Sequence, residues 1–266
     1  MKKILITGAR SGIIGDVIKK IKEDYILYVA VHTESELRAI KKIYKDYKNI
    51  KCMKLDLSLD EDINKLDQID IDVLVCNGAV AESGSLLDIP FSNIRYNFEI
   101  NFFSNLKIIK KVILKNENVK IVIVSSLAGK LPMPFLGSYS ASKAALSQFI
   151  KALNWEAKLL NRKIDLCLVE PGLYRTGFNK LAFDKKYDFM DNESFFKSQI
   201  ENIRKAENIY LYLFEKRCLN SISNKIVKAI KDENPRFYYR APFSQVLFVK
   251  LYNILFWNSA LKNMQF

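Results

Sequence analysis

Residues 3–15 read Lys3-Ile4-Leu5-Ile6-Thr7-Gly8-Ala9-Arg10-Ser11-Gly12-Ile13-Ile14-Gly15, which joins a short apolar strand pattern to a helical pattern through a glycine-rich turn. Glycine tolerates positive φ angles and lets the backbone approach a pyrophosphate closely, and the N–H groups at the start of a helix attract that anion. Many turns contain glycine, so the composition alone is weak evidence. The position of this turn, between the first strand and the first helix, indicates a dinucleotide-binding site.

The same alternation of strand and helix continues along the chain. Apolar runs occur at residues 4–6, 26–31, 50–55, 72–76, 120–124, 164–169 and 236–239. Segments with helical periodicity cover 13–22, 34–44, 60–66, 92–114, 138–161 and 222–230. Such strands, buried on both faces and joined by right-handed crossovers, predict a Rossmann-type doubly wound α/β fold. We expect one domain, residues 1–266, with a mostly parallel seven-stranded sheet and helices on both faces.

Composition narrows the class of protein. The formal charge is +13, but lysine is spread through nearly every segment, and no base-reading motif is visible. We therefore expect no nucleic-acid partner. The four cysteines are far apart and lie mostly in apolar runs, which argues against a metal cluster or a disulfide framework. The chain enters a strand pattern at once, without an export signal, so a cytoplasmic location is expected.

Polar residues follow three of the predicted strands at the edge where ligands of open α/β sheets bind. Asp56-Leu57 follows the third strand and Asn77-Gly78-Ala79 the fourth. Asp56 fits either a helix cap or an adenine contact. The second strand ends in His32-Thr33 without the acidic residue that binds the ribose of NAD, and Arg10 lies in the glycine loop, so NADP(H) is favoured and NAD(H) stays open. Arg10 and His32 also fit solvated surface positions.

A serine, a tyrosine and a lysine form the candidate catalytic set. Ser126 follows the fifth strand, and Tyr139 and Lys143 stand four residues apart in a helical segment. Residues at i and i+4 share one helix face, so the ammonium is expected to lie near the phenol and to lower its pKa. Taken alone, this pair also fits an exposed helix face.

Together these motifs resemble the short-chain dehydrogenase/reductase family over almost the whole chain. The resemblance rests on Thr7-Gly8 with Gly12, on Asp56, on Asn77-Gly78-Ala79 where the family has Asn-Ala-Gly, and on Asn101, Ser126, Tyr139 and Lys143. Pro171-Gly172, followed by Thr176, completes the series.

The resemblance implies an enzyme that interconverts a carbonyl and an alcohol by hydride transfer. Tyr139 would exchange the proton, Ser126 would bind the substrate oxygen, Lys143 would hold the nicotinamide ribose, and Asn101 would fix a water. A homodimer or homotetramer is expected. The implied cofactor-binding residues are Gly8, Arg10, Ser11, Gly12, Ile14, His32, Thr33, Asp56, Leu57, Asn77, Gly78, Ala79, Tyr139, Lys143, Pro171, Gly172 and Thr176.

Two departures from the family pattern affect the cofactor end. Gly12-Ile13-Ile14-Gly15 has one residue more than the usual Gly-Ile-Gly. An extra residue turns a helix by about 100°, so we expect Gly15 to miss its close-packing position and the first helix to begin with a bulge. The order Asn77-Gly78-Ala79 is a milder change, since small residues still permit close approach to a cofactor.

Two segments fall outside the sheet pattern. Residues 178–220 are predicted to form a substrate lid, whose aromatic residues fit either an apolar substrate or packing against the sheet. They are Phe178, Phe183, Tyr187, Phe189, Phe195 and Phe196. Residues 241–266 are apolar at 243–257, but Gln245, Lys250 and Asn253 interrupt the run, so a spanning helix is not expected. Packing on the chain's own domain or a second subunit, and peripheral contact with the inner face of a membrane, both remain open.

A second class of function has the same fold: a dinucleotide-binding redox sensor or scaffold with little turnover. Asn101, Ser126, Tyr139 and Lys143 come from three separate segments, and no structural requirement makes them occur together. Their co-occurrence favours an enzyme.

Overall fold

The computed structural model describes residues 1–188, 190 and 194–263, and its centre is one sheet in which every neighbouring pair of strands is parallel. The spatial order is β3-β2-β1-β4-β5-β6-β7. The prediction of a seven-stranded, doubly wound sheet is confirmed. The strands are β1 (Lys3–Ile6), β2 (Ile26–Val31), β3 (Ile50–Lys54), β4 (Val73–Cys76), β5 (Asn118–Val124), β6 (Lys163–Pro171) and β7 (Tyr238–Ala241).

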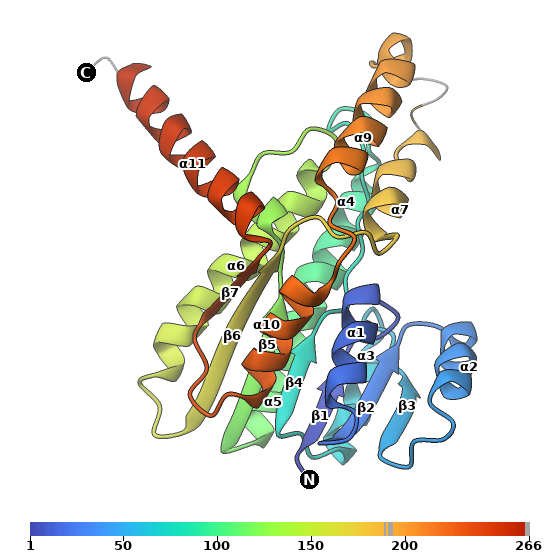
Figure 1. Cartoon of the computed structure of the whole chain (residues 1–266), viewed down its shortest axis with the longest axis vertical. Helices are drawn as coiled ribbons and strands as arrows, with labels where there is room; N and C mark the ends of the chain where they lie inside the picture. Colours follow the sequence, from blue (N-terminus) through green and yellow to red (C-terminus); the bar gives the residue numbers. More distant parts are fainter. Residues whose placement is uncertain (189, 191–193, 264–266) are drawn as a thin grey trace.

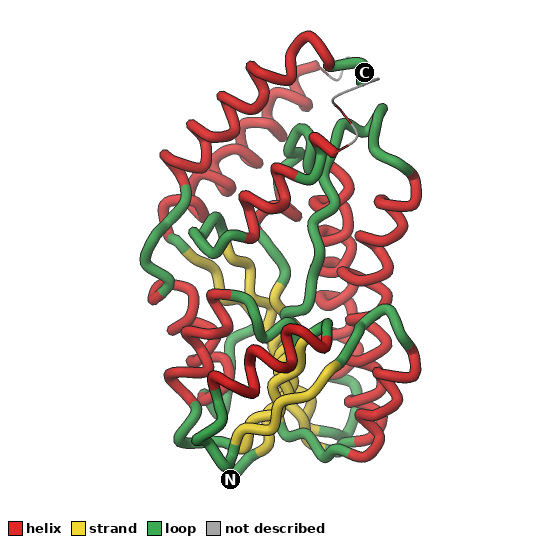
Figure 2. Tube along the Cα trace, turned by 90° about the vertical axis from the view of Figure 1, so that its right-hand side faces the viewer, coloured by secondary structure: helices red, strands yellow, loops and turns green. Residues whose placement is uncertain are grey.

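Helices cover both faces of this sheet (Figures 1 and 2). One face packs against α1 (Gly12–Ile21), α2 (Glu34–Ile43) and α10 (Asn220–Lys231), whose buried isoleucines share a core cluster with the strands. The other face packs against α5 (Asn105–Lys115) and α6 (Gly137–Ala157), together with the shorter α3 (Asp60–Asn64) and the 3-10 turn η1 (Lys65–Gln68). Alternate residues of each strand therefore point into two separate cores, as parallel strands require.

The first helix begins without the predicted bulge, so that expectation is wrong. Gly12 starts α1, and the amide of Gly15 donates to the Ser11 carbonyl at 2.9 Å, the spacing of an ordinary helical turn. The extra residue is absorbed because Ile14 is buried and forms one apolar face with Val17 and the isoleucines that follow. Gly15 itself has no neighbour within 4 Å of an added Cβ, so it makes no close contact.

The long helix predicted over 92–114 is interrupted at its centre. It comprises α4 (Phe91–Phe98), the π-helical segment η2 (Glu99–Ser104) and α5. Asn101 lies within the π-helical turn. Such turns occur mostly as local insertions in α-helices and are frequent at functional sites.

The two segments outside the sheet pattern are helical. The 178–220 segment contains α7 (Phe178–Asp184), the short 3-10 turn η4 (Lys197–Gln199) and α9 (Ile200–Phe214). The chain's last helix, α11 (Phe243–Asn263), leaves the body at the same end of the molecule and diverges from α9 (Figure 1). Among the described residues, we find no helix with the length and apolar content needed to cross a bilayer.

Candidate active site

A cavity of about 910 Å³ lies beyond the carboxyl ends of the strands and reaches α7 and α9 of the predicted lid and the base of α11. The sheet order changes direction between β1 and β4, and ligands of open α/β sheets bind outside such a switch point. Ile14, Thr33 and Asn101 do not line the cavity. The predicted residues that do are Gly8, Arg10, Ser11, Gly12, His32, Asp56, Leu57, Asn77, Gly78, Ala79, Ser126, Tyr139, Lys143, Pro171, Gly172 and Thr176.

The turns after β1 and β4 are linked by hydrogen bonds. Thr7 is buried, and its hydroxyl accepts hydrogen bonds from the amides of Asn77 and Gly78, both at 3.0 Å. The Asn77 side chain donates to the Gly8 carbonyl at 2.9 Å. Gly8 has φ +62°, and a Cβ there would lie 2.7 Å from the Gly78 Cα. Glycine is needed at position 8 for both reasons, and the result is a backbone cradle that fits a pyrophosphate.

The end of the cavity farthest from the catalytic candidates carries polar side chains from the residues that follow β2 and β3. Asp56 Oδ1 accepts hydrogen bonds from the amide and hydroxyl of Ser58, and Asp56 Oδ2 lies 3.2 Å from His32 Nε2. Burial would raise the pKa of Asp56, but the Ser58 hydrogen bonds, together with the nearby His32 and Lys54, hold this pKa below its ordinary value. The helix-cap alternative for Asp56 is wrong, because Leu59 is the N-cap of α3.

A carboxylate that we did not single out lies at the same end. Glu36 lines the cavity, and its Oε2 accepts hydrogen bonds from the amides of His32 and Thr33. Thr33 in turn caps α2 by accepting from the Glu36 amide. The capping-box spacing Thr-x-x-Glu was visible in the sequence, but it does not indicate that the glutamate also faces a ligand.

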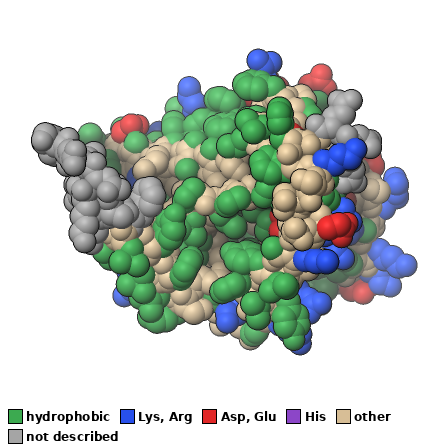
Figure 3. Space-filling view, turned by 90° about the horizontal axis from the view of Figure 1, so that it is seen from above, with side chains coloured by type: hydrophobic (Ala, Val, Ile, Leu, Met, Phe, Trp, Pro, Cys, Tyr) green, Lys and Arg blue, Asp and Glu red, His purple; other side chains and the backbone are tan. Residues whose placement is uncertain are grey.

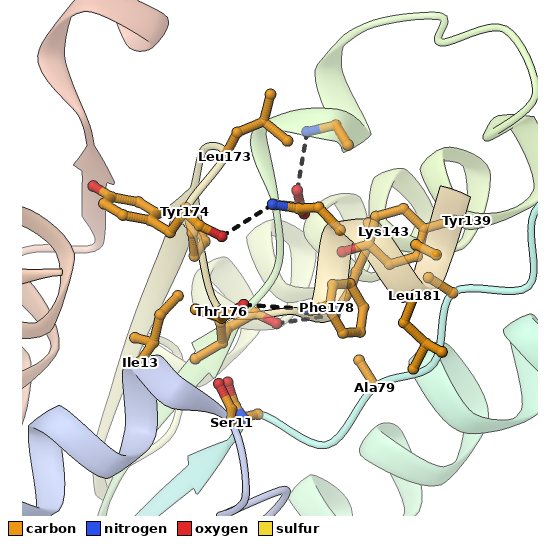
Figure 4. Close-up of a pocket in the computed structure, with 18 of the residues that line it drawn as sticks. Ser11, Ile13, Ala79, Tyr139, Lys143, Leu173, Tyr174, Thr176, Phe178 and Leu181 are labelled. Carbon is orange, nitrogen blue, oxygen red and sulfur yellow. Dashed lines mark hydrogen bonds between the residues drawn. The ribbon is translucent and has the colours of Figure 1, made fainter. Parts of the chain in front are cut away.

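Tyr139 and Lys143 lie one turn apart on α6, and both line the cavity (Figure 4). The Lys143 ammonium is 6.0 Å from the centre of the Tyr139 ring and donates to the Val124 carbonyl at 3.1 Å. The ring of Phe178, from the lid, lies 6.0 Å from that of Tyr139, centre to centre. The tyrosine is thus enclosed between the lysine, the end of β5 and an aromatic wall.

Burial determines the ionisation of both residues. It raises the pKa of Tyr139 to about 12, and hydrogen bonding with Ser126 acts in the opposite direction. It lowers the pKa of Lys143 to about 8, because an ammonium is penalised away from water. The prediction that Lys143 lowers the tyrosine pKa is therefore wrong here, since desolvation of the phenol dominates. A neutral phenol at physiological pH is the form that can give a proton.

The segment after β5 brings Ser126 to this pair. Ser126 caps a 3-10 turn, η3 (Leu127–Lys130), by accepting a hydrogen bond from the Ala128 amide at 3.1 Å. Gly129 permits the turn to rest on α6, because a Cβ there would lie 2.9 Å from the backbone of Lys143 and Ala144. The serine hydroxyl and the phenol consequently share one side of the cavity.

Three asparagines, one turn apart on the long helix, hold residues 78–82, of which 78–81 line the cavity. Asn97 accepts from the Glu82 amide at 3.0 Å and donates to the Glu82 carbonyl at 2.8 Å. Asn101 makes the same pair of bonds with Val80, both at 2.8 Å. Four helical residues rise about 6 Å and two extended residues about 6.6 Å, so the two spacings match.

This asparagine ladder, Asn97 with Asn101 and Asn105, also limits what Asn101 can do. Asn105 completes the ladder by donating to the Gly78 carbonyl at 3.3 Å. The Asn101 side chain is fully buried and donates further to Ser142 at 3.0 Å. Its side-chain amide is engaged by protein atoms on both sides, so the side chain holds the wall, and the role of Asn101 in fixing a water stays a prediction.

The sequence of this chain matches a known protein family. The family model described as short chain dehydrogenase matches residues 2–186. This range includes the glycine turn after β1 and the catalytic candidates Ser126, Tyr139 and Lys143. The chain belongs to this family.

Several relatives of this short-chain dehydrogenase match it over most of its length. VdlC of Helicobacter pylori, a probable short-chain type dehydrogenase/reductase, is 29% identical over 266 residues, covering 94% of this chain and 92% of its own. The 3-ketodihydrosphingosine reductase of Bacteroides thetaiotaomicron is 28% identical over 263 residues, covering 93% and 90%. A short-chain dehydrogenase/reductase from Burkholderia phymatum, solved with NAD, is 21% identical, with TM-score 0.77 and coverage of 94% and 92%.

The predicted lid of this short-chain dehydrogenase, residues 178–220, contributes apolar side chains to the cavity. Phe178 and Phe183 line it, whereas Tyr187 packs in a separate cluster with Met190 and Ile200. Phe195 is exposed, and Phe196 packs edge-on against Phe135. Phe189 lies outside the described residues. Phe178 and Phe183 therefore face the cavity, while Tyr187 and Phe196 pack against residues outside the sheet. Leu131, Met133, Leu136 and Tyr210 also line the cavity.

The base of α11 contributes residues to the dehydrogenase site that sequence reasoning missed. Gln245 Oε1 accepts from the Leu173 amide at 2.7 Å, and its Nε2 donates to the Phe214 carbonyl at 2.9 Å. Phe248 lines the cavity mouth. Their approach to the Pro171-Gly172 turn depends on tertiary packing of segments over 70 residues apart, and no local pattern signals it. Among the described residues, we find no side-chain cluster able to hold a metal ion.

Proposed function

We propose that this short-chain dehydrogenase interconverts a carbonyl and an alcohol on a bulky apolar substrate, with NADP(H) as the redox cofactor. The observation that carries the proposal is one continuous cavity. It joins the backbone cradle at Gly8, the serine, tyrosine and lysine set, and an apolar compartment under the lid. A redox sensor would need the cradle but not the compartment.

The residues of the chain would handle the oxygen and its proton. A bound nicotinamide supplies or accepts the hydride. The neutral phenol of Tyr139 would give its proton to the carbonyl oxygen, and the Ser126 hydroxyl would hydrogen-bond the same oxygen as negative charge develops on it. The ammonium of Lys143 lies one turn away and would stabilise the tyrosinate that remains. The cradle at Gly8 would hold the pyrophosphate.

Basic and acidic side chains at the same end of the cavity favour different cofactors. Arg10 and His32 line the far end of the cavity and would attract a 2′-phosphate. Glu36, at the same end, would instead accept a hydrogen bond from a ribose 2′-hydroxyl, and this specific observation favours NAD(H) as the second candidate. The Glu36 carboxylate already accepts two backbone hydrogen bonds at the start of α2, which offset part of its charge. We therefore retain NADP(H).

The substrate class rests on the cavity wall. Leucine, methionine and phenylalanine side chains enclose the space around Tyr139, and an apolar ligand would bury these surfaces. The relative named 3-ketodihydrosphingosine reductase, to judge by that name, reduces a ketone on a lipid. A long-chain or polycyclic ketone is the substrate that both observations support.

The test is oxidation of NADPH and NADH with a panel of ketones, by the wild type and by Arg10→Ala. Turnover is expected with long-chain or polycyclic ketones and with NADPH preferred. Arg10→Ala should lower kcat/KM for NADPH about tenfold, the effect of one charge-assisted hydrogen bond, with little change for NADH. Arg38→Ala, an exposed arginine on α2 outside the cavity, is the control. Preference of the wild type for NADH would reverse the cofactor choice, and absence of turnover with every ketone would reject the function.

A further inference from the structure

One side of α11, between Leu247 and Leu255, is an exposed apolar face. Leu251, Ile254 and Leu255 are each more than half exposed, and Leu247 is nearly so. With about 100° between successive residues, these four lie within an arc of about 100° on one side of the helix. Val249, which is buried, faces the body instead. The helix therefore packs through its base and carries a second apolar face that the described residues leave uncovered.

The lid presents a matching surface on the other side of the cavity mouth. Ile209 and Leu213 of α9 are more than half exposed and close in angle on that helix. Viewed from above, hydrophobic side chains surround a central hollow (Figure 3). We use the name apolar rim for six of the exposed apolar side chains of the two helices: Ile209, Leu213, Phe248, Leu251, Ile254 and Leu255.

The apolar rim is continuous with the cavity. Leu213 and Phe248 line the cavity and are also more than half exposed, so each side chain belongs to both surfaces. A substrate entering between the two helices would move along apolar surface from the outside to Tyr139. Large exposed apolar patches on soluble proteins mark sites of contact with another molecule.

A bilayer fits this surface better than a protein partner. A protein seated on both helices would close the mouth that substrate and product must use, whereas a lipid surface covers the rim and keeps the mouth in contact with apolar molecules. The charge also fits. The α11 sequence contains Lys250 and Lys262 and no acidic residue, and the chain's formal charge is +13. Lys250 is exposed on the same helix as the apolar face, an arrangement typical of interfacial helices.

We infer that the apolar rim docks on an anionic lipid surface and takes a lipid-like carbonyl substrate directly from it. The part of this inference that concerns the substrate rests on the proposed function. The part that concerns docking rests on the apolar rim alone. Docking through α9 and α11 leaves the cofactor end of the cavity, around Gly8 and His32, on the opposite side from the bilayer.

The experiment is cosedimentation of the full chain with vesicles of phosphatidylcholine containing about one third phosphatidylglycerol. The test variant is Leu251→Asp with Ile254→Asp, two rim residues that do not line the cavity. The matched control is Leu114→Asp with Leu159→Asp, two exposed leucines outside the rim. Wild type and control should bind the vesicles, and the rim variant should bind at least about tenfold more weakly. Its kcat/KM with a water-soluble ketone should stay within about twofold of wild type.

Three outcomes would overturn the docking. The first is no vesicle binding by the wild type, and the second is equal binding by the rim variant and its control. The third is a concentration-dependent oligomer of the wild type that the rim variant loses without any vesicle binding, which would assign the rim to a second copy of the chain. Vesicle binding that depends on the rim, in a protein that turns over no ketone, would sustain the docking and reject only the proposed function.

Discussion

At the scale of single residues, burial of Lys143 in the site lowers the free energy of unfolding of the protein. Its side chain is 2% exposed, and burial lowers its pKa to about 8, whereas a lysine in an unfolded chain titrates near 10.4. At pH 7 the folded protein therefore holds a desolvated ammonium, at a cost of about 3 kcal/mol. Between about pH 8 and pH 10.4 the unfolded chain binds more protons than the folded one, so this residue's contribution to the free energy of unfolding rises with pH.

Replacing Lys143 should separate stability from activity. Lys143→Met is expected to abolish turnover and to raise the free energy of unfolding at pH 7 by about 1–3 kcal/mol, with a smaller gain at about pH 9.5. Urea unfolding at the two pH values measures both effects. A Lys143→Met protein less stable than wild type at pH 7 would show that the lysine's contacts outweigh its desolvation.

At the scale of elements, the asparagine ladder couples the long helix to the cavity wall. Asn97 is fully buried and pairs with both backbone groups of Glu82, next to the wall residues Val80 and Ala81. Removing its side chain leaves a buried amide and carbonyl without partners, which costs about 1–3 kcal/mol each. We infer that Asn97 positions the wall, although it does not touch the cavity.

Asn97→Ala should therefore lower stability and also raise KM for the ketone several-fold, with a smaller change in kcat. The control is Asn116→Ala at the end of α5, where the side chain donates to the Val112 carbonyl far from the cavity. Steady-state kinetics on both variants distinguishes a positioning role from a structural one. If both lose stability and neither changes KM, the ladder only supports the fold.

The elements themselves were predictable where a local pattern sufficed. Strand runs such as 26–31 and the helical periodicity from Glu34 match the structure to within a residue or two. The start of α1 was not predicted correctly, because Ile14 is buried on the apolar face of the helix and the extra residue fits without a bulge. The π-helical turn at Asn101 also escaped prediction, since the bonds from Asn101 and its neighbours in the ladder to residues 78–82 are tertiary contacts.

At the scale of the whole molecule, the sequence motifs predicted which residues the fold brings together at the cavity. They did not predict the ionisation of those residues. Ser126, Tyr139 and Lys143 meet at one cavity because each follows or faces the end of β5. The direction of the tyrosine pKa depends on how completely the lid and α6 exclude water, which no motif encodes. The contact of Gln245 with the turn after β6 arises in the same way, from packing between distant segments, whereas Glu36 is held locally by the capping box at the start of α2.

The most direct test of the central claim, carbonyl–alcohol redox with Tyr139 as the proton donor, is a comparison of wild type and Tyr139→Phe. NADPH oxidation with the best ketone and NADPH binding by fluorescence should be measured on both proteins. Tyr139→Phe removes only the hydroxyl, so kcat should fall about 10²–10⁴-fold while the Kd for NADPH stays within about threefold. Near-normal turnover by Tyr139→Phe would contradict the account, as would a wild-type protein that binds NADPH tightly and reduces no ketone.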